Sequence, residues 1–357
     1  MRSNATWPIR TPVPGSVLPV ITHTRLAGPR LAGNLLGDPT ERDLYVYLPP
    51  GYEDSDERYP TAYLLHYFGS SAQELVYPRA DKERWSPPLQ DVLDPVFTRL
   101  ATPPMIVIIP DGWTSYGCSQ WVDSPVGGNF ESYLLHDVVT HVDEHFRTIP
   151  QASSRGVFGF SSGGFGAWHV VSRHPEAFSA LAMLSGDSYF DLTHKPMLYE
   201  YLDSIWPEAP KGPVEAIYMS QMIYALASCY SPNPDNPPYY VDLPMDFPSG
   251  EIKSEVWNQW LSFDPVVNWR DRFDNLRQLK GILLDVGARD DISLQWGHRL
   301  LSHYLGEAGI VHEASEHAGN HGSRSRERYQ VSLQWLATVL ERAGARSSRA
   351  SRSPTRR

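Results

Sequence analysis

Residues 155–167 read Arg-Gly-Val-Phe-Gly-Phe-Ser-Ser-Gly-Gly-Phe-Gly-Ala. An apolar segment leads into Gly-x-Ser-x-Gly, and the residues after it carry an apolar face at helical spacing. This pattern predicts a nucleophile elbow, a strand-to-helix turn so tight that Gly159 and Gly163 must lack a Cβ atom. The turn would expose the hydroxyl of Ser161 and aim the N–H of Ser162 at a developing oxyanion. The alternative interpretation is a glycine- and serine-rich loop without chemistry.

Apolar strands and helices alternate through most of the chain. Fully apolar strands are typical of a parallel sheet covered by helices on both faces, so we expect an α/β fold with a mostly parallel central sheet. Such sheets carry functional residues in the loops beyond the carboxyl ends of their strands. The expected strands are 42–48, 61–65, 105–109, the segment before Ser161, 178–184, 282–286 and a short strand at 311–314. The expected helices include 130–146, the segment after Ser161, 294–305 and 329–340.

The stretch 188–275 breaks this alternation. It is dense in tryptophan and tyrosine, and it contains the proline-rich run Ser-Pro-Asn-Pro-Asp-Asn-Pro-Pro at 231–238. Because it is too long for an ordinary connection, we interpret it as a lid-like insertion that caps the site. A surface decoration that only stabilises the body is the alternative. The expected organisation is an N-terminal extension at 1–21, an α/β domain at 22–342 and a disordered basic tail at 343–357.

Composition and charge restrict the class of protein. The 357 residues carry a formal net charge of −10, and the basic tail holds five arginines and no acidic residue. An acidic body gives no support for nucleic-acid binding. The chain has no run of about 18 apolar residues, which a membrane-spanning helix would need, and its first residues lack the apolar core of a secretory signal. Two cysteines make no disulfide framework. We therefore expect a cytoplasmic protein without a nucleic-acid or membrane partner, and its oligomeric state stays open.

A serine nucleophile needs a histidine base, and that histidine needs a carboxylate to orient it. In folds with this elbow, the chain order is serine, then acid, then histidine. Asp290 comes just beyond the carboxyl end of the strand at 282–286, where an acid can reach a histidine. Asp291 is the alternative acid, and its other role would be to cap the helix that starts near Ser293.

Two histidines follow the last expected strand. Residues 316–322 read Glu-His-Ala-Gly-Asn-His-Gly, and His321 stands beside Gly322 before the closing helix. This position predicts His321 as the general base, with His317 as the alternative. For either residue, the interpretation without chemistry is an ordinary histidine in a surface loop.

A second oxyanion donor should come from the loop after the strand at 61–65, which reads His-Tyr-Phe-Gly at 66–69. We predict that the N–H of Phe68 joins that of Ser162 in an oxyanion hole. His66 is expected to orient this loop rather than to transfer a proton.

Three further side chains are expected to contact the substrate. They are Tyr67, beside Phe68, and Gln120 and Trp121, in the polar loop after the strand at 105–109. The chain has no glycine-rich phosphate loop with a lysine, no His-Glu-x-x-His and no cysteine spacing typical of a metal site. Neither a cofactor nor a metal is therefore expected.

Six short motifs together resemble a known family. They are Leu-Pro-Pro-Gly-Tyr at 48–52, Tyr-Leu-Leu-His at 63–66, Ile-Pro-Asp-Gly at 109–112, the elbow at 159–167, His-Pro-Glu-Ala-Phe at 174–178 and Gly-Ala-Arg-Asp at 287–290. In these motifs the chain resembles the putative-esterase branch of the α/β-hydrolase superfamily, which includes feruloyl esterases, S-formylglutathione hydrolases, enterochelin-type esterases and mycolyltransferases. The resemblance implies an α/β-hydrolase fold with Ser161, Asp290 and His321 as nucleophile, acid and base. It also implies Phe68 and Ser162 as the amide donors.

These expectations predict a serine hydrolase that cleaves a small-molecule carboxylic ester through an acyl-enzyme on Ser161. An acyltransferase that passes the same acyl group to an alcohol or amine is one alternative. A non-catalytic binding module on the same scaffold is another. The loop after the strand at 61–65 departs from the family, because Tyr67 follows His66 where relatives often have glycine. The ester itself does not transfer from the resemblance.

Overall fold

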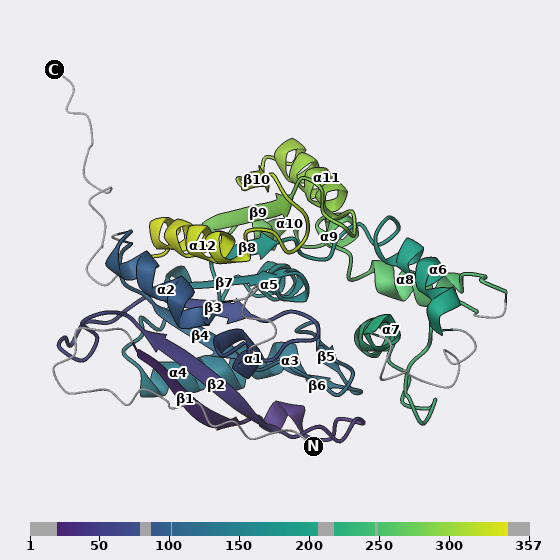
Figure 1. Ribbon diagram of the computed structural model, residues 1–357, viewed down its shortest axis with the longest axis horizontal. Coiled ribbons are helices and arrows are strands. Elements are labelled where there is room, and N and C mark those ends of the chain that lie inside the picture. The colour runs from purple at the N-terminus through teal and green to yellow at the C-terminus, as the bar shows by residue number, and fades with distance from the viewer. Residues whose placement is uncertain (1–19, 79–86, 101, 206–217, 247–248, 342–357) are drawn as a thin grey trace.

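One eight-stranded sheet runs through the protein, of which the computed structural model describes residues 20–78, 87–100, 102–205, 218–246 and 249–341 (Figure 1). In spatial order the strands are β1 (Val20–Ala27), β2 (Glu41–Leu48), β4 (Ile106–Pro110), β3 (Thr61–Leu65), β7 (Arg155–Phe160), β8 (Ala180–Leu184), β9 (Gly281–Gly287) and β10 (Glu313–His317). β2 runs antiparallel to both β1 and β4, and every pairing from β4 to β10 is parallel. The expected mostly parallel central sheet is confirmed.

Two apolar clusters, one on each face of the sheet, fill the space beneath the helices. Along β3, Tyr63 and Leu65 lie in one cluster and Ala62 and Leu64 in the other, because successive side chains of a strand point to opposite faces. All four are fully buried, which is why the strands read as apolar without alternation. The first cluster is covered by α3 (Phe130–Ser132), α4 (Val139–His145), α5 (Ser162–Arg173) and α11 (Leu294–Glu307). The second is covered by α1 (Ala72–Val76), α2 (Leu89–Thr98) and α12 (Ser325–Val339). None of the helices described here combines the length and the apolar character needed to cross a bilayer.

Two elements differ in detail from the expectations. The helix expected at 130–146 is divided, because α3 passes into a wider π-helical segment, Tyr133–Val138, before α4. The last strand was expected at 311–314, but β10 begins only at Glu313. It pairs with β9 alone at the sheet edge, and the side chains of residues 313–316 are exposed, so apolar residues do not mark it.

The described part of the stretch 188–275 contains helices joined by loops. α6 (His194–Ile205), α7 (Tyr218–Tyr230) and α8 (Ser254–Leu261) stand beyond one end of the sheet, at the right of Figure 1. α9 (Pro265–Asn268) and α10 (Phe273–Leu276) instead pack against α5 and α11.

A third apolar cluster joins this stretch to the body of the protein. Tyr230, Trp257 and Trp260 of the inserted helices lie in it together with Phe68 and Phe165. The helices α7 and α8 therefore pack directly against the loop after β3 and against the helix that follows Ser161.

Candidate active site

The turn at Ser161 has the conformation that an elbow requires. Ser161 adopts φ 56° and ψ −124°, a left-handed backbone that is strained for a residue with a side chain. Its N–H donates to the carbonyl of Leu184 at 2.9 Å, and its carbonyl accepts from the N–H of Phe165 at 2.9 Å. A Cβ atom on Gly163 would lie 2.0 Å from the carbonyl oxygen of Leu65, and one on Gly159 would lie 2.5 Å from the backbone of Gly163. The glycines are therefore needed because backbone segments cross here without room for a side chain.

A continuous hydrogen-bond chain connects three of the predicted residues. The Nε2 atom of His321 lies 3.1 Å from Oγ of Ser161, and its Nδ1 atom lies 2.8 Å from Oδ2 of Asp290. In the tautomer that satisfies both contacts, Nδ1–H donates to the carboxylate and Nε2 accepts from the serine hydroxyl. The three residues lie beyond the carboxyl ends of β7, β9 and β10, which are parallel strands, so the loops meet at one edge of the sheet.

The Asp290 carboxylate is held in its charged form. It is buried, which by itself raises its pKa, but the hydrogen bond and charge of His321, together with bonds from the Ile292 N–H and the Ser185 hydroxyl, outweigh burial and place the pKa below the ordinary value. The Ile292 N–H donates to Oδ1 at 3.1 Å. A buried carboxylate that stays ionised can orient and stabilise a protonated imidazole.

The alternative acid and base lie elsewhere. Asp291 is exposed, whereas Asp290 is buried and contacts His321. His317 comes within 3.9 Å of Asp285, through its Nδ1 atom. The structure therefore brings Asp290 and His321, and neither alternative, to Ser161.

The loop after β3 is fixed against the loop after β4. The buried ring of His66 accepts a hydrogen bond at Nε2 from the Gly112 N–H, at 2.8 Å, while its Nδ1 atom faces the Tyr67 carbonyl at 3.2 Å. Burial lowers the pKa of His66, although the nearby carboxylate of Asp111 opposes that effect. A neutral imidazole accepting at one nitrogen and donating at the other is suited to holding two loops together.

The predicted oxyanion donors lie in two segments, the start of α5 and the loop after β3. Ser162 is the first residue of α5, where backbone N–H groups have no acceptor within the helix. Phe68 lies in the loop after β3, with its ring against Gly117, and the N–H of the neighbouring Gly69 donates to the Gly117 carbonyl at 3.1 Å. These contacts hold the Phe68 backbone beside the loop that follows β4.

The structure separates the three expected substrate contacts. Tyr67 is partly buried, and its ring meets Phe160 edge-on at 5.5 Å. Trp121 is fully buried and donates its indole N–H to the His66 carbonyl at 3.2 Å, so in this structure it is a core residue closed to solvent. Gln120 is also fully buried, and its Nε2 atom lies 3.2 Å from Oγ of Ser162.

Sequence reasoning missed Asp187, a fully buried carboxylate in the loop after β8. Its Oδ2 atom accepts from Nε2 of Gln120 at 3.4 Å. Burial raises the pKa of Asp187 to about 6, although the charge of His321 and the Gln120 amide oppose the shift. Its position beyond the carboxyl end of an apolar strand was the available signal, because Asp290 and Ser161 share it.

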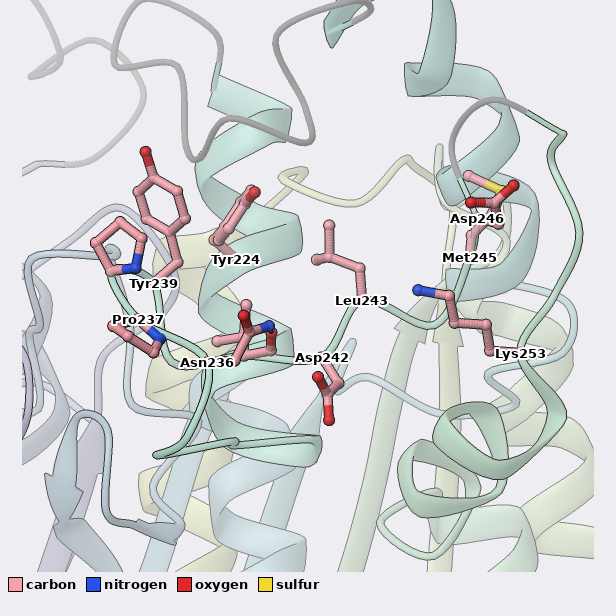
Figure 2. A pocket seen from close by; sticks show the side chains of 11 residues that line it. Tyr224, Asn236, Pro237, Tyr239, Asp242, Leu243, Met245, Asp246 and Lys253 are labelled. Atoms are coloured by element: carbon pink, nitrogen blue, oxygen red, sulfur yellow. The ribbon is translucent and has the colours of Figure 1, made fainter.

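A cavity of about 300 Å³ lies within the insertion (Figure 2). Tyr224 on α7 and Tyr239 form part of its wall, and Lys253 directs its amine toward the centre from the opposite side. Tyr116, which follows β4, donates its hydroxyl to the Tyr239 carbonyl at 3.2 Å and connects this wall to the body. None of the predicted site residues lines this cavity.

Comparison with known proteins adds a family and a set of folds. The family described as "Putative esterase" matches residues 38–333. An esterase of Mycobacterium tuberculosis is 28% identical over 146 residues, which are 40% of this chain and 28% of that protein. The chain thus spans well under half the length of that curated relative.

Solved structures resemble the protein over nearly all of its length. A ferulic acid esterase superposes with a TM-score of 0.59 at 17% identity, over 91% of this chain and 100% of that one. An S-formylglutathione hydrolase from Staphylococcus aureus superposes with a TM-score of 0.55 at 14% identity, over 89% of this chain and 99% of that one. The fold is accordingly the α/β-hydrolase fold.

Proposed function

The chain belongs to the putative esterase family, and from this premise we propose that it is a carboxylic ester hydrolase that works through an acyl-enzyme on Ser161. The observation that carries the proposal is the hydrogen-bond chain from Ser161 through His321 to Asp290, with contacts of 3.1 and 2.8 Å. A nucleophile, a base and an orienting acid in this arrangement perform acyl transfer on several unrelated folds.

The reaction begins when Oγ of Ser161 attacks the ester carbonyl and its proton passes to Nε2 of His321. Asp290 holds the ring in position and stabilises the imidazolium that forms. When the tetrahedral intermediate collapses, the carbon–oxygen bond to the alcohol breaks and His321 gives its proton to the departing alkoxide. Water then attacks the acyl carbon while His321 takes its proton. The bond from that carbon to Oγ of Ser161 breaks, His321 returns the proton to Oγ, and the carboxylic acid leaves.

The oxyanion is held by the backbone N–H groups of Ser162 and Phe68 in this proposal. Support comes from the place of Ser162 at the start of α5 and from the packing of Phe68 against Gly117. Gln120 helps to hold the start of α5 in place through its contact with the Ser162 hydroxyl. Tyr67 borders the site beside Phe160. Since each lost oxyanion donor typically costs about 2.7–4 kcal/mol in the transition state, small displacements of these loops matter.

We further propose that the chain comprises one hydrolase domain at 22–342 with the stretch 188–275 as its lid-like insertion. The shared apolar cluster of Tyr230, Phe68 and Phe165 supports this, because it joins α7 to the loop after β3 and to α5.

Turnover of p-nitrophenyl butyrate tests the proposal. The wild-type protein is expected to release p-nitrophenol, and Ser161→Ala to lose this activity while keeping its fold by circular dichroism. Ser262→Ala, which removes an exposed serine hydroxyl, is the matched control and should keep full activity. Equal turnover by Ser161→Ala would reject the acyl-enzyme, and failure of a fluorophosphonate probe to label Ser161 would favour a binding module. Transfer product in the presence of an added alcohol, in excess over hydrolysis, would favour an acyltransferase.

A further inference from the structure

We infer that Arg328, on α12, is a positioning residue that holds His321 and Asp290 in register with Ser161. The inference rests on the function proposed above. The guanidinium of Arg328 is buried, with 5% of the residue exposed. Few arginines are buried to this extent unless every donor has a partner.

The guanidinium reaches the site at two points. Nη1 donates to the main-chain carbonyl of His321 at 3.1 Å, which holds the loop that carries the imidazole. Nη2 donates to Oγ of Ser185 at 2.9 Å, and the Ser185 hydroxyl in turn contributes to lowering the pKa of the Asp290 carboxylate. One side chain is therefore connected to both the base and the acid of the proposed mechanism.

A third contact reaches the strand that carries the nucleophile. The guanidinium carbon lies 5.3 Å from the ring centroid of Phe160, the residue before Ser161, which is within the range of a cation–π contact. The same ring also contacts the imidazole of His321, with centroids 4.6 Å apart. Phe160 thus contacts both the guanidinium and the imidazole, and displacement of Arg328 removes a contact from the residue next to Ser161.

The ion pair with Asp285 holds the guanidinium in place but does not by itself account for the contacts with His321 and Ser185. Nε of Arg328 donates to Oδ1 of Asp285 on β9, and Nη2 donates to the Asp285 carbonyl at 3.2 Å. A lysine could keep the ion pair, yet its single nitrogen could not also reach His321 and Ser185, because only a guanidinium presents donors in a rigid fork. Ser185 adopts φ 42°, and a strained backbone persists where surrounding contacts such as these hold it.

The variant Arg328→Lys distinguishes the positioning of His321 and Asp290 from the ion pair with Asp285. We expect kcat for p-nitrophenyl butyrate to fall about ten- to a hundredfold with KM within about twofold of wild type, because misplacement of a proton-transfer group affects the transition state and not substrate binding. The rate of fluorophosphonate labelling at Ser161 should fall in parallel. Arg299→Lys is the matched control, since Arg299 forms two hydrogen bonds to Glu316, of 2.6 and 2.7 Å, on the exposed side of α11. It should keep kcat within about twofold of wild type.

Ser185→Ala tests the same connection with a smaller change. We expect a fall in kcat with KM unchanged and a melting temperature close to that of wild type. If Arg328→Lys fails to fold, this variant decides the question. Wild-type kcat in Ser185→Ala, or losses confined to KM in either variant, would overturn the role of Arg328. An inactive wild-type protein would instead reject the proposed function itself.

Discussion

Asp187→Asn is expected to stabilise the protein at neutral pH and to leave its stability unchanged in acid. The carboxylate is fully buried, and its partner in the described structure is the Gln120 amide at 3.4 Å. Asparagine has nearly the same shape, and its carbonyl oxygen can accept the same hydrogen bond. The substitution therefore removes a buried charge and little packing.

The size of the effect follows from the pKa. Burial raises the pKa of Asp187 from 3.8 to about 6, and each pKa unit corresponds to about 1.4 kcal/mol, so ionisation destabilises the folded state by about 3 kcal/mol. Between about pH 4 and pH 6 the folded protein retains a proton that the unfolded chain has lost, so stability falls as pH rises. Above about pH 6 both states are ionised, and the full cost is present.

Urea unfolding followed by tryptophan fluorescence, at intervals from pH 4 to pH 8, measures the difference. The advantage of Asp187→Asn should grow between about pH 4 and pH 6 to roughly 3 kcal/mol and stay level from there to pH 8. Asp191→Asn is the matched control. Burial raises its pKa, but the hydrogen bonds from Lys195 and the Trp257 indole together outweigh burial and lower the pKa below 3.8, so this variant should be less stable than wild type by an amount that stays nearly constant from pH 4 to pH 8. A difference for Asp187→Asn that does not vary with pH would refute the reasoning.

Two further predictions concern the elbow and the acid. Asp290→Asn should lower kcat by about 10³- to 10⁴-fold, because an amide stabilises the wrong imidazole tautomer, whereas exposed Asp291→Asn should stay within about twofold of wild type in the same ester assay. Similar losses in both variants would contradict this. Gly163→Ala should cost about 3 kcal/mol in urea unfolding, since the new Cβ would lie 2.0 Å from the Leu65 carbonyl. Gly306→Ala, whose Cβ would meet nothing nearer than 3.9 Å, should be neutral or stabilising, and equal costs would refute the steric account.

The strand-to-helix turn was predictable because its signal is local. Gly159, Ser161 and Gly163 indicate a point where backbone segments cross closely, and any chain that makes this turn must leave room for that crossing. β10 was misplaced because an edge strand with exposed side chains carries no apolar pattern. The antiparallel edge strand β1 begins at Val20, inside the segment expected as an extension, for the related reason that only Ile21 and Leu26 of its eight residues are buried.

Trp121 illustrates why a residue type does not predict its surroundings. A tryptophan in a polar loop suggested a substrate contact, but the indole lies under the His66 carbonyl and against Gly112 and Gly166, closed to solvent. The loop folds inward because two successive residues, Gln120 and Trp121, adopt positive φ. The local sequence does not indicate this backbone conformation.

By itself, the sequence determined the α/β fold class, the elbow and the order in which an acid and a histidine follow Ser161. Each of these depends on spacing along the chain or on the apolar character of a single strand. Only the tertiary structure decided that His321 contacts the Ser161 hydroxyl and Asp290 contacts His321, whereas Asp291 is exposed and His317 lies beside Asp285. It also revealed the buried carboxylate of Asp187 and the reach of Arg328. The two candidate acids are adjacent in the chain, and the two candidate histidines are one backbone turn apart. Which of them reaches the site is set by contacts between segments up to 160 residues apart.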